Sequence, residues 1–185
     1  MQQTSGVRAN ALRRELVLTT EAPARVGAEQ VFDVLADLRS HAVWSGERQR
    51  PKTRLLSIEA PEGPASVGTE FVSTGSDPSG RFTDRSVVTE ASRPSVLEFV
   101  TEARLDTKHG ASDWTLVHRY ELTPASDGCR VGYTIRVTRM SALPGALRLF
   151  NVPVVSALLR AAATGVARRG VRNLVACAEE RAGAR

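Results

Sequence analysis

The sequence predicts an α+β fold in which one long C-terminal helix lies across a seven-stranded antiparallel sheet, with two short helices after the first strand. Two observations lead to this prediction. The stretch from Leu143 to about Ala182 carries apolar residues at helical spacing over roughly eight turns. Upstream of it, short runs of alternating apolar and polar residues are separated by turn-forming segments, which is typical of strands. Because so long an apolar stripe needs a large apolar partner, we expect the helix to lie across the sheet.

The C-terminal helix is defined by its apolar positions and by two prolines. Pro144 and Pro153 predict a short helical piece, a bend beginning at Asn151, and a long stretch beyond it. The apolar stripe consists of Val155, Leu158, Leu159, Ala162, Val166, Val171, Leu174, Val175 and Ala178. Four basic residues point away from this stripe, namely Arg160, Arg168, Arg169 and Arg172. The helix should therefore have one apolar and one basic face.

The domain is expected to begin after residues 1–14, which are polar and show no sustained periodicity and which we interpret as a disordered lead-in. A chain of 185 residues is long enough for one core and short for two, so residues 15–182 should form a single domain. The alternating run Glu15–Val26 predicts the first strand. Apolar residues on one helical face then predict a short helix over Ala28–Leu38.

A second short helix should follow, capped by Ser40 and ending near Gly46. Six further strand candidates come after it, and the connections between most of them are short enough to make successive strands antiparallel neighbours. Their ranges are Thr53–Ala60, Gly68–Gly75, Arg81–Ala91, Val96–Arg104, Asp113–Pro124 and Cys129–Arg139.

Alternation assigns faces in the last two strands, because successive side chains point to opposite sides of a sheet. One shared side is expected to hold Trp114, Leu116, His118, Tyr120 and Leu122 in one strand, and Val131, Tyr133, Ile135 and Val137 in the next. The residues between them, which include Arg119, Glu121, Arg130, Thr134 and Arg136, are expected to face solvent. The apolar side should meet the helices.

The net charge of +5 is unevenly distributed, since residues 139–185 hold eight arginines and two glutamates. We interpret this excess as a solvated face of the C-terminal helix. Contact with an anionic membrane surface or with a protein partner is a less favoured alternative. Nucleic acid is not expected as a partner, because no aromatic residue interleaves the basic positions of this helix.

Sequence patterns of membrane, disulfide and secreted proteins are absent. No apolar run reaches the roughly 18 residues of a membrane span, and the N-terminal stretch has no apolar core of signal-peptide length. Cys129 and Cys177 lie far apart and suggest neither a disulfide framework nor a zinc site. We therefore expect a cytoplasmic protein.

No metal or cofactor is predicted. Asp33, Asp37 and His41 fall at spacings of four residues, but the first short helix should end before His41 and take it off that line. The sequence also lacks a glycine-rich phosphate loop and the common metalloprotease and nucleophile motifs.

Three stretches give the chain a family resemblance: ARVGAEQVFDVLADLRSHAVW (Ala24–Trp44), VGTEF (Val67–Phe71) and VVTEASRPSVLEF (Val87–Phe99). Together with the closing piece Ser141–Glu180, they resemble the START-like SRPBCC superfamily of the polyketide cyclase/dehydrase and lipid-transport type. This resemblance implies a helix-grip fold, in which a curved sheet wraps around the long C-terminal helix. It also implies a cavity between sheet and helix that binds an apolar or aromatic small molecule.

The expected ligand-binding residues are mostly aromatic. Contact area would come from Trp44, Phe71, Phe82, Phe99, Trp114, Tyr120, Tyr133 and Phe150. His118 would be the polar anchor, although it could also be a core histidine satisfied by a tyrosine or by the backbone. One residue of the pair Asp84 and Arg85 must face the cavity, and Arg85 is a candidate if it has an anionic partner there.

The leading hypothesis is a protein that binds a hydrophobic, ring-containing small molecule. An aromatase/cyclase or dehydratase-type enzyme is the alternative, with His118, Tyr120 or Tyr133 moving a proton during enolisation. The strand RFTDRSVVTEA (Arg81–Ala91) lacks the tryptophan that cyclases of this superfamily typically place there, which argues against cyclase chemistry. A second alternative is a peripheral membrane or partner-binding module that uses the basic C-terminal helix. Ligand identity and oligomeric state stay open.

Overall fold

The computed structural model describes residues 16–49, 54–77, 80–141 and 153–183. In chain order its elements are β1 (Leu16–Ala24), α1 (Ala28–Ala36), three short helical turns η1 (Leu38–Ser40), η2 (Ala42–Gly46) and η3 (Glu47–Gln49), strands β2 (Arg54–Glu59), β3 (Glu70–Asp77), β4 (Gly80–Ser92), β5 (Val96–Thr107), β6 (Gly110–Ala125) and β7 (Gly128–Met140), and α2 (Pro153–Gly183). The predicted first short helix is α1. Three consecutive single turns replace the predicted second one.

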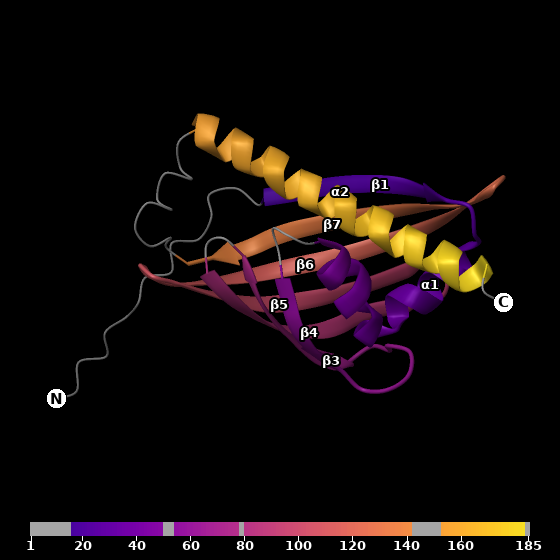
Figure 1. Cartoon of the computed structure of the whole chain (residues 1–185), viewed down its shortest axis with the longest axis horizontal. Coiled ribbons are helices and arrows are strands. Elements are labelled where there is room, and N and C mark those ends of the chain that lie inside the picture. Colours follow the sequence, from indigo (N-terminus) through magenta and orange to yellow (C-terminus); the bar gives the residue numbers. More distant parts are fainter. Residues whose placement is uncertain (1–15, 50–53, 78–79, 142–152, 184–185) are drawn as a thin grey trace.

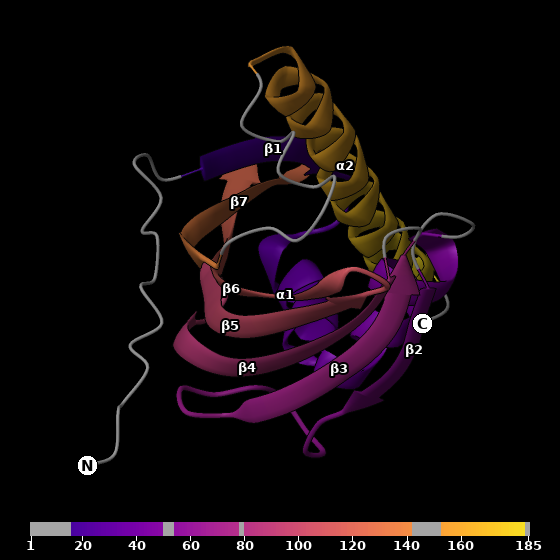
Figure 2. The same ribbon diagram turned by 90° about the vertical axis from the view of Figure 1, so that its left-hand side faces the viewer.

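The seven strands form one antiparallel sheet in the order β1-β7-β6-β5-β4-β3-β2. Only β1 leaves the sequential order, since it pairs with β7 at the far edge. Figures 1 and 2 show the sheet curving around α1 and the η turns, with α2 crossing beside β1. This arrangement confirms the predicted α+β fold with a curved seven-stranded sheet and a long C-terminal helix.

The core lies between the concave face of the sheet and the helices. Helix α1 buries Val31, Phe32 and Leu35 because these residues share one face of the helix. Val131 and Leu97 oppose them from the sheet and are fully buried. Cys129 and Cys177 are also buried, and both are free thiols.

Helix α2 packs into this core over only part of its length. Val171, Leu174 and Ala178 are at most 1% exposed. Ala162 and Val166 were expected in the same stripe, but both are exposed, Val166 to 42%. Figure 2 shows the reason, since the N-terminal half of α2 projects beyond the edge of the sheet. The expectation that the whole stripe meets the sheet was therefore wrong for these two residues.

The other features predicted for α2 can be compared with the structure only in part. The side chains of Val155, Leu158 and Leu159, and the bend at Asn151, lie outside the described part of the molecule. The four arginines of the predicted basic face, Arg160, Arg168, Arg169 and Arg172, are all exposed. Among the described residues, no helix combines the length and apolarity that crossing a membrane requires.

Side chains tie the η turns to α2. The amide Nδ2 of Asn173 donates to the backbone carbonyl of Trp44 at 3.0 Å, and Nε2 of Gln49 donates to the carbonyl of Val166 at 3.2 Å. An ion pair between Arg48 and Glu180 adds a third link at 2.6 Å. These contacts hold η2 and η3 between α2 and the open part of the sheet.

Candidate functional site

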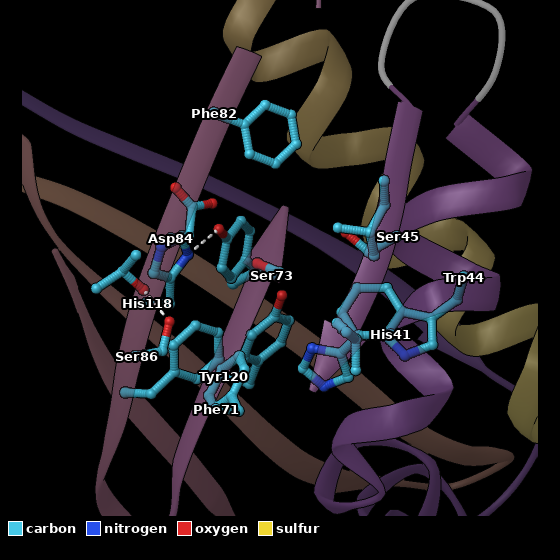
Figure 3. Close-up of a pocket in the computed structure, with 15 residues that line it drawn as sticks. His41, Trp44, Ser45, Phe71, Ser73, Phe82, Asp84, Ser86, His118 and Tyr120 are labelled. Atoms are coloured by element: carbon cyan, nitrogen blue, oxygen red, sulfur yellow. Dashed lines mark hydrogen bonds between the residues drawn. The ribbon is translucent and has the colours of Figure 1, made fainter. Parts of the chain in front are cut away.

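A cavity of about 230 Å³ lies between the concave face of the sheet and the turn that begins at His41. The lining side chains come from strands β2 to β7 and from the His41–Ser45 segment, and Figure 3 shows them pointing toward one another across this space. The lining residues are His41, Trp44, Ser45, Leu55, Ile58, Phe71, Ser73, Phe82, Asp84, Ser86, Phe99, Thr101, His118, Tyr120 and Tyr133.

The position of this pocket corrects one expectation. The helical wall was expected to be the C-terminal helix, but none of the described side chains of α2 lines the pocket. The wall is the His41–Ser45 segment, and Asn173 of α2 reaches only the backbone carbonyl of Trp44 in that wall. Helix α2 therefore supports the pocket wall from behind.

Most of the expected ligand-binding residues meet in this pocket. The members of that set found in the lining are Trp44, Phe71, Phe82, Phe99, His118, Tyr120 and Tyr133. Alternation brings them together, because Phe82 and Phe99 lie on the same sheet face as His118 in β6. The three candidates for proton transfer, His118, Tyr120 and Tyr133, are thus in one site.

Two expected residues lie elsewhere, and Phe150 falls outside the described residues. Arg85 is exposed on the opposite face of β4, while its neighbour Asp84 faces the pocket. Trp114 is partly buried toward one end of β6, where its Nε1–H donates to Ser112 Oγ at 2.8 Å. Arg85 and Trp114 therefore do not line the pocket.

Aromatic rings form a continuous cluster in the pocket. The rings of Phe99 and His118 stack with centroids 4.7 Å apart, and those of Tyr120 and Tyr133 stack at 4.5 Å. Phe71 meets Phe99 edge-on at 5.3 Å. Stacked and edge-on geometries are the favourable ones for aromatic pairs, so the cluster is well packed around the cavity.

The polar centre of the cluster is a hydrogen bond of 2.7 Å between His118 Nδ1 and the hydroxyl of Tyr133. Burial lowers the pKa of His118 to about 3, so its imidazole is neutral at pH 7. Burial also raises the pKa of Tyr120 and of Tyr133 above the usual value of tyrosine, so both phenols stay protonated. The group formed by His118, Tyr120 and Tyr133 is therefore polar but uncharged.

His41 is a second buried imidazole on the opposite wall. Its Nε2 lies 3.0 Å from the backbone carbonyl of Leu35, and because a carbonyl only accepts, Nε2 carries the proton. Burial lowers the pKa of His41 to about 4, which leaves Nδ1 unprotonated at neutral pH. The ring of His41 contacts those of Trp44 and Phe71, with centroids at 4.5 and 6.0 Å.

Asp33, Asp37 and His41, which are spaced by four residues in the sequence, have different partners in the structure. Asp33 pairs with Arg93 at 2.8 Å, and Asp37 pairs with Arg181 at 3.2 Å. His41 points instead into the aromatic pocket. Both carboxylates are therefore engaged by arginines.

Sequence reasoning missed several polar lining residues. Ser73, Ser86 and Thr101 lie on the inward positions of their strands, and Ser86 Oγ is 2.8 Å from Thr101 Oγ1. Alternation could have found them, because each lies an even number of residues from an aromatic lining residue in its own strand: Ser73 and Thr101 at two residues, Ser86 at four. Ser45 and His41 lie in single helical turns, where no periodic signal exists.

A larger and more open depression of about 620 Å³ lies where β1 ends beside α2. Its lining includes Arg25, Asp127 and Glu179, and the backbone N–H of Arg25 already donates to Glu179 at 2.8 Å. Exposed turn residues make up much of its rim, and none of its described lining residues is aromatic. The aromatic pocket, with inward polar groups at its centre, is the better candidate for a ligand site.

Comparison with solved structures gives matches that cover about 90% of this chain. An uncharacterized protein from Rhizobium leguminosarum superposes with a TM-score of 0.65 at 12% identity, covering 90% of this chain and 96% of that one. The di-domain ARO/CYC StfQ from the steffimycin biosynthetic pathway gives 0.65 at 17%, covering 91% of this chain and 52% of that one. Ara h 8.0201 gives 0.56 at 11%, covering 90% and 98%. At these identities the likeness shows the fold alone.

Comparison with protein families is more specific. No curated protein matches this sequence. Residues 15–179 match the model of the family described as polyketide cyclase / dehydrase and lipid transport. This match spans nearly the whole chain and agrees with the helix-grip arrangement of sheet and helix. The chain therefore belongs to the polyketide cyclase/dehydrase and lipid-transport family.

Proposed function

We propose that this protein binds a hydrophobic, ring-containing small molecule in the pocket between the sheet and the His41–Ser45 segment. The observation that supports this proposal is the aromatic cavity of about 230 Å³ with a hydrogen-bonded His118–Tyr133 pair at its centre. A dry apolar cavity of about 150 Å³ is enough for benzene. The pocket is therefore suited to one or two rings and is small for a long lipid chain.

His118 is the proposed polar anchor. A neutral imidazole carries one proton, so when the Tyr133 hydroxyl donates to Nδ1, the proton of His118 lies on Nε2. That N–H is then available to an oxygen of the ligand, such as a carbonyl or a phenol. The stacked rings of Phe99 and His118 would hold the ligand ring close to this donor.

An enzyme of the cyclase or dehydratase type is the alternative, which the family and the likeness to the ARO/CYC StfQ bring into consideration. Such an enzyme needs a group that exchanges protons near neutral pH. His118, with a pKa of about 3, is a weak base, and the raised pKa values of Tyr120 and Tyr133 make them weak acids. These properties argue against His118, Tyr120 and Tyr133 as the groups that would transfer the proton.

The first experiment is native mass spectrometry of the freshly purified protein, compared with the same sample after denaturation. A bound mass that disappears on denaturation supports the proposal and identifies the ligand class. Naphthol is the probe for protein without such a ligand, with binding followed through quenching of tryptophan fluorescence. Trp44 lines the pocket, so its emission should respond to an occupant.

A matched pair of variants tests the location of the site. Ser45→Phe places a ring in the pocket, while Val43→Phe places the same ring on the exposed side of the same turn, where Val43 is 38% exposed. The proposal expects naphthol binding to be lost in Ser45→Phe and kept in Val43→Phe. Equal binding by both folded variants would show that this pocket is not the site.

His118→Phe separates binding from catalysis. A binding protein should lose affinity for naphthol in this variant, because the N–H donor is gone. The enzyme alternative predicts that a short poly-β-ketone is converted by the natural protein and not by His118→Phe, while naphthol binding survives. Mass spectrometry of the reaction mixture measures this conversion.

A further inference from the structure

Among the described residues that line the aromatic pocket, Asp84 is the only one with a carboxylate. Strand β4 turns Phe82, Asp84 and Ser86 toward the cavity, because alternate residues share a face. The register places Asp84 beside Ser73 in β3 and Ala103 in β5, and neither side chain is cationic. None of the described lining residues is a lysine or an arginine.

Asp84 differs from the acids on the outer face of the sheet. There, Glu90 pairs with Arg119 at 2.6 Å, and Glu102 pairs with Arg139 at 3.1 Å. The described residues provide no hydrogen bond or ion pair to the carboxylate of Asp84. A buried or partly buried carboxylate without a partner is costly, so such groups are normally paired.

The surroundings of Asp84 indicate the charge of the group that would pair with its carboxylate. Partial burial raises its pKa to about 6, so the group is still mainly ionised at pH 7. Aromatic rings with electron-rich faces, among them Phe71, Phe82 and Phe99, lie in the same pocket. Such faces attract cations and do not attract anions. A carboxylate together with several aromatic rings therefore favours the binding of a positively charged group.

We propose that Asp84 selects ligands that carry a protonated amine on their ring system, so that the natural ligand of this pocket is an organic cation. This inference rests on the proposed function, since it concerns the same pocket. The amine forms a charge-assisted hydrogen bond with the Asp84 carboxylate. The ring system fills the space among the aromatic side chains, with any oxygen directed to His118.

A matched set of probes tests this selection. Naphthylmethylamine is a cation at neutral pH, naphthylmethanol is its neutral counterpart of similar size, and naphthoic acid is an anion. Calorimetry should show that the protein binds the amine about tenfold to hundredfold more tightly than the alcohol, which is the strength of a hydrogen bond to a charged group. The acid should bind most weakly.

Two variants complete the experiment. Asp84→Asn keeps the size of the side chain and removes its charge, and it should reduce amine binding to about the level of the alcohol. Asp127→Asn makes the same change of net charge in the exposed turn between β6 and β7 and should leave the preference unchanged. Circular dichroism checks that each variant is folded.

The outcomes separate this inference from the proposed function. If the alcohol binds and the amine shows no preference, the inference is wrong and the pocket remains a binding site. If Asp84→Asn weakens both probes equally, Asp84 supports the pocket without selecting charge, and the inference is again wrong. If neither probe binds, both proposals fail. If Asp84→Asn binds both probes as the natural protein does but no longer converts a poly-β-ketone, the inference is wrong and Asp84 is an acid of an enzyme instead.

Discussion

Replacing Asp84 by asparagine should stabilise the unliganded protein at pH 8. Burial raises the pKa of this carboxyl from 3.8 to about 6, which means that the fold disfavours the ionised form. A difference of about two pKa units corresponds to about 3 kcal/mol. Water that enters the pocket screens the charge, so we expect Asp84→Asn to raise the free energy of unfolding by about 1–3 kcal/mol.

The stabilisation by Asp84→Asn should depend on pH. The folded state binds the Asp84 proton more tightly than the unfolded state, so the penalty is complete above pH 6 and disappears as the pH falls below 3.8. The gain in Asp84→Asn should therefore fall to about one third at pH 4.5. Urea unfolding at both pH values measures it, with Asp127→Asn as the control.

A particular result would refute this reasoning. If Asp84→Asn is no more stable than Asp127→Asn at pH 8, the carboxylate is not strained in the fold. A gain of equal size at pH 8 and pH 4.5 would show that the effect does not come from ionisation. The expected result would mean that the pocket keeps an unfavourable charge, which is common where function requires it.

Three further predictions concern stability and are measured by urea unfolding. Burial lowers the pKa of His41 to about 4 and of His118 to about 3, so the unfolded state binds more protons and the free energy of unfolding should fall as the pH drops from 6.5 to about 4. In His118→Gln the free energy of unfolding should fall less steeply with pH, and the same slope as in the natural protein would contradict this. Leu174→Ala should lower the free energy of unfolding by about 2–5 kcal/mol and Val166→Ala by less than about 1 kcal/mol, because of these two residues only Leu174 is buried. Equal losses would place both residues in the core. Gly128→Ala should cost about 1–3 kcal/mol, since φ is +139° and a Cβ would lie 2.1 Å from a β1 carbonyl oxygen; a neutral effect would show that this turn can relax.

The strand positions were predictable because their signals are local. Alternation and turn residues lie within a few positions of each other, so β3 to β7 could be located along the sequence. The same alternation placed His118 and Tyr120 on one face, and the structure puts both in the pocket. What these signals lack is any information about how far along α2 the core extends, which is why Val166 was misplaced.

The choice between Asp84 and Arg85 shows a second limit. Val87 and Val88 are both apolar, so the pattern does not reveal which of them faces inward. In the structure Val88 is 1% exposed and Val87 39%, which turns Asp84 inward. An irregularity in the pairing with β5 follows directly after Val88 and interrupts the alternation.

The pocket wall formed by the η turns could not be predicted. Single helical turns are too short to show a hydrophobic period. The ring of His41 meets those of Phe71 and Phe99, which come from strands far along the chain. Such contacts depend on the curvature of the whole sheet, and a local pattern does not contain it.

The way in which this wall is held also bears on how such a pocket can change during evolution. Asn173 and Gln49 attach it to α2 through backbone carbonyl groups, those of Trp44 and Val166. A bond to a backbone carbonyl does not depend on the side chain at that position. Trp44 and Ser45 can therefore be exchanged while the attachment remains, so ligand preference can diverge between relatives without loss of the scaffold.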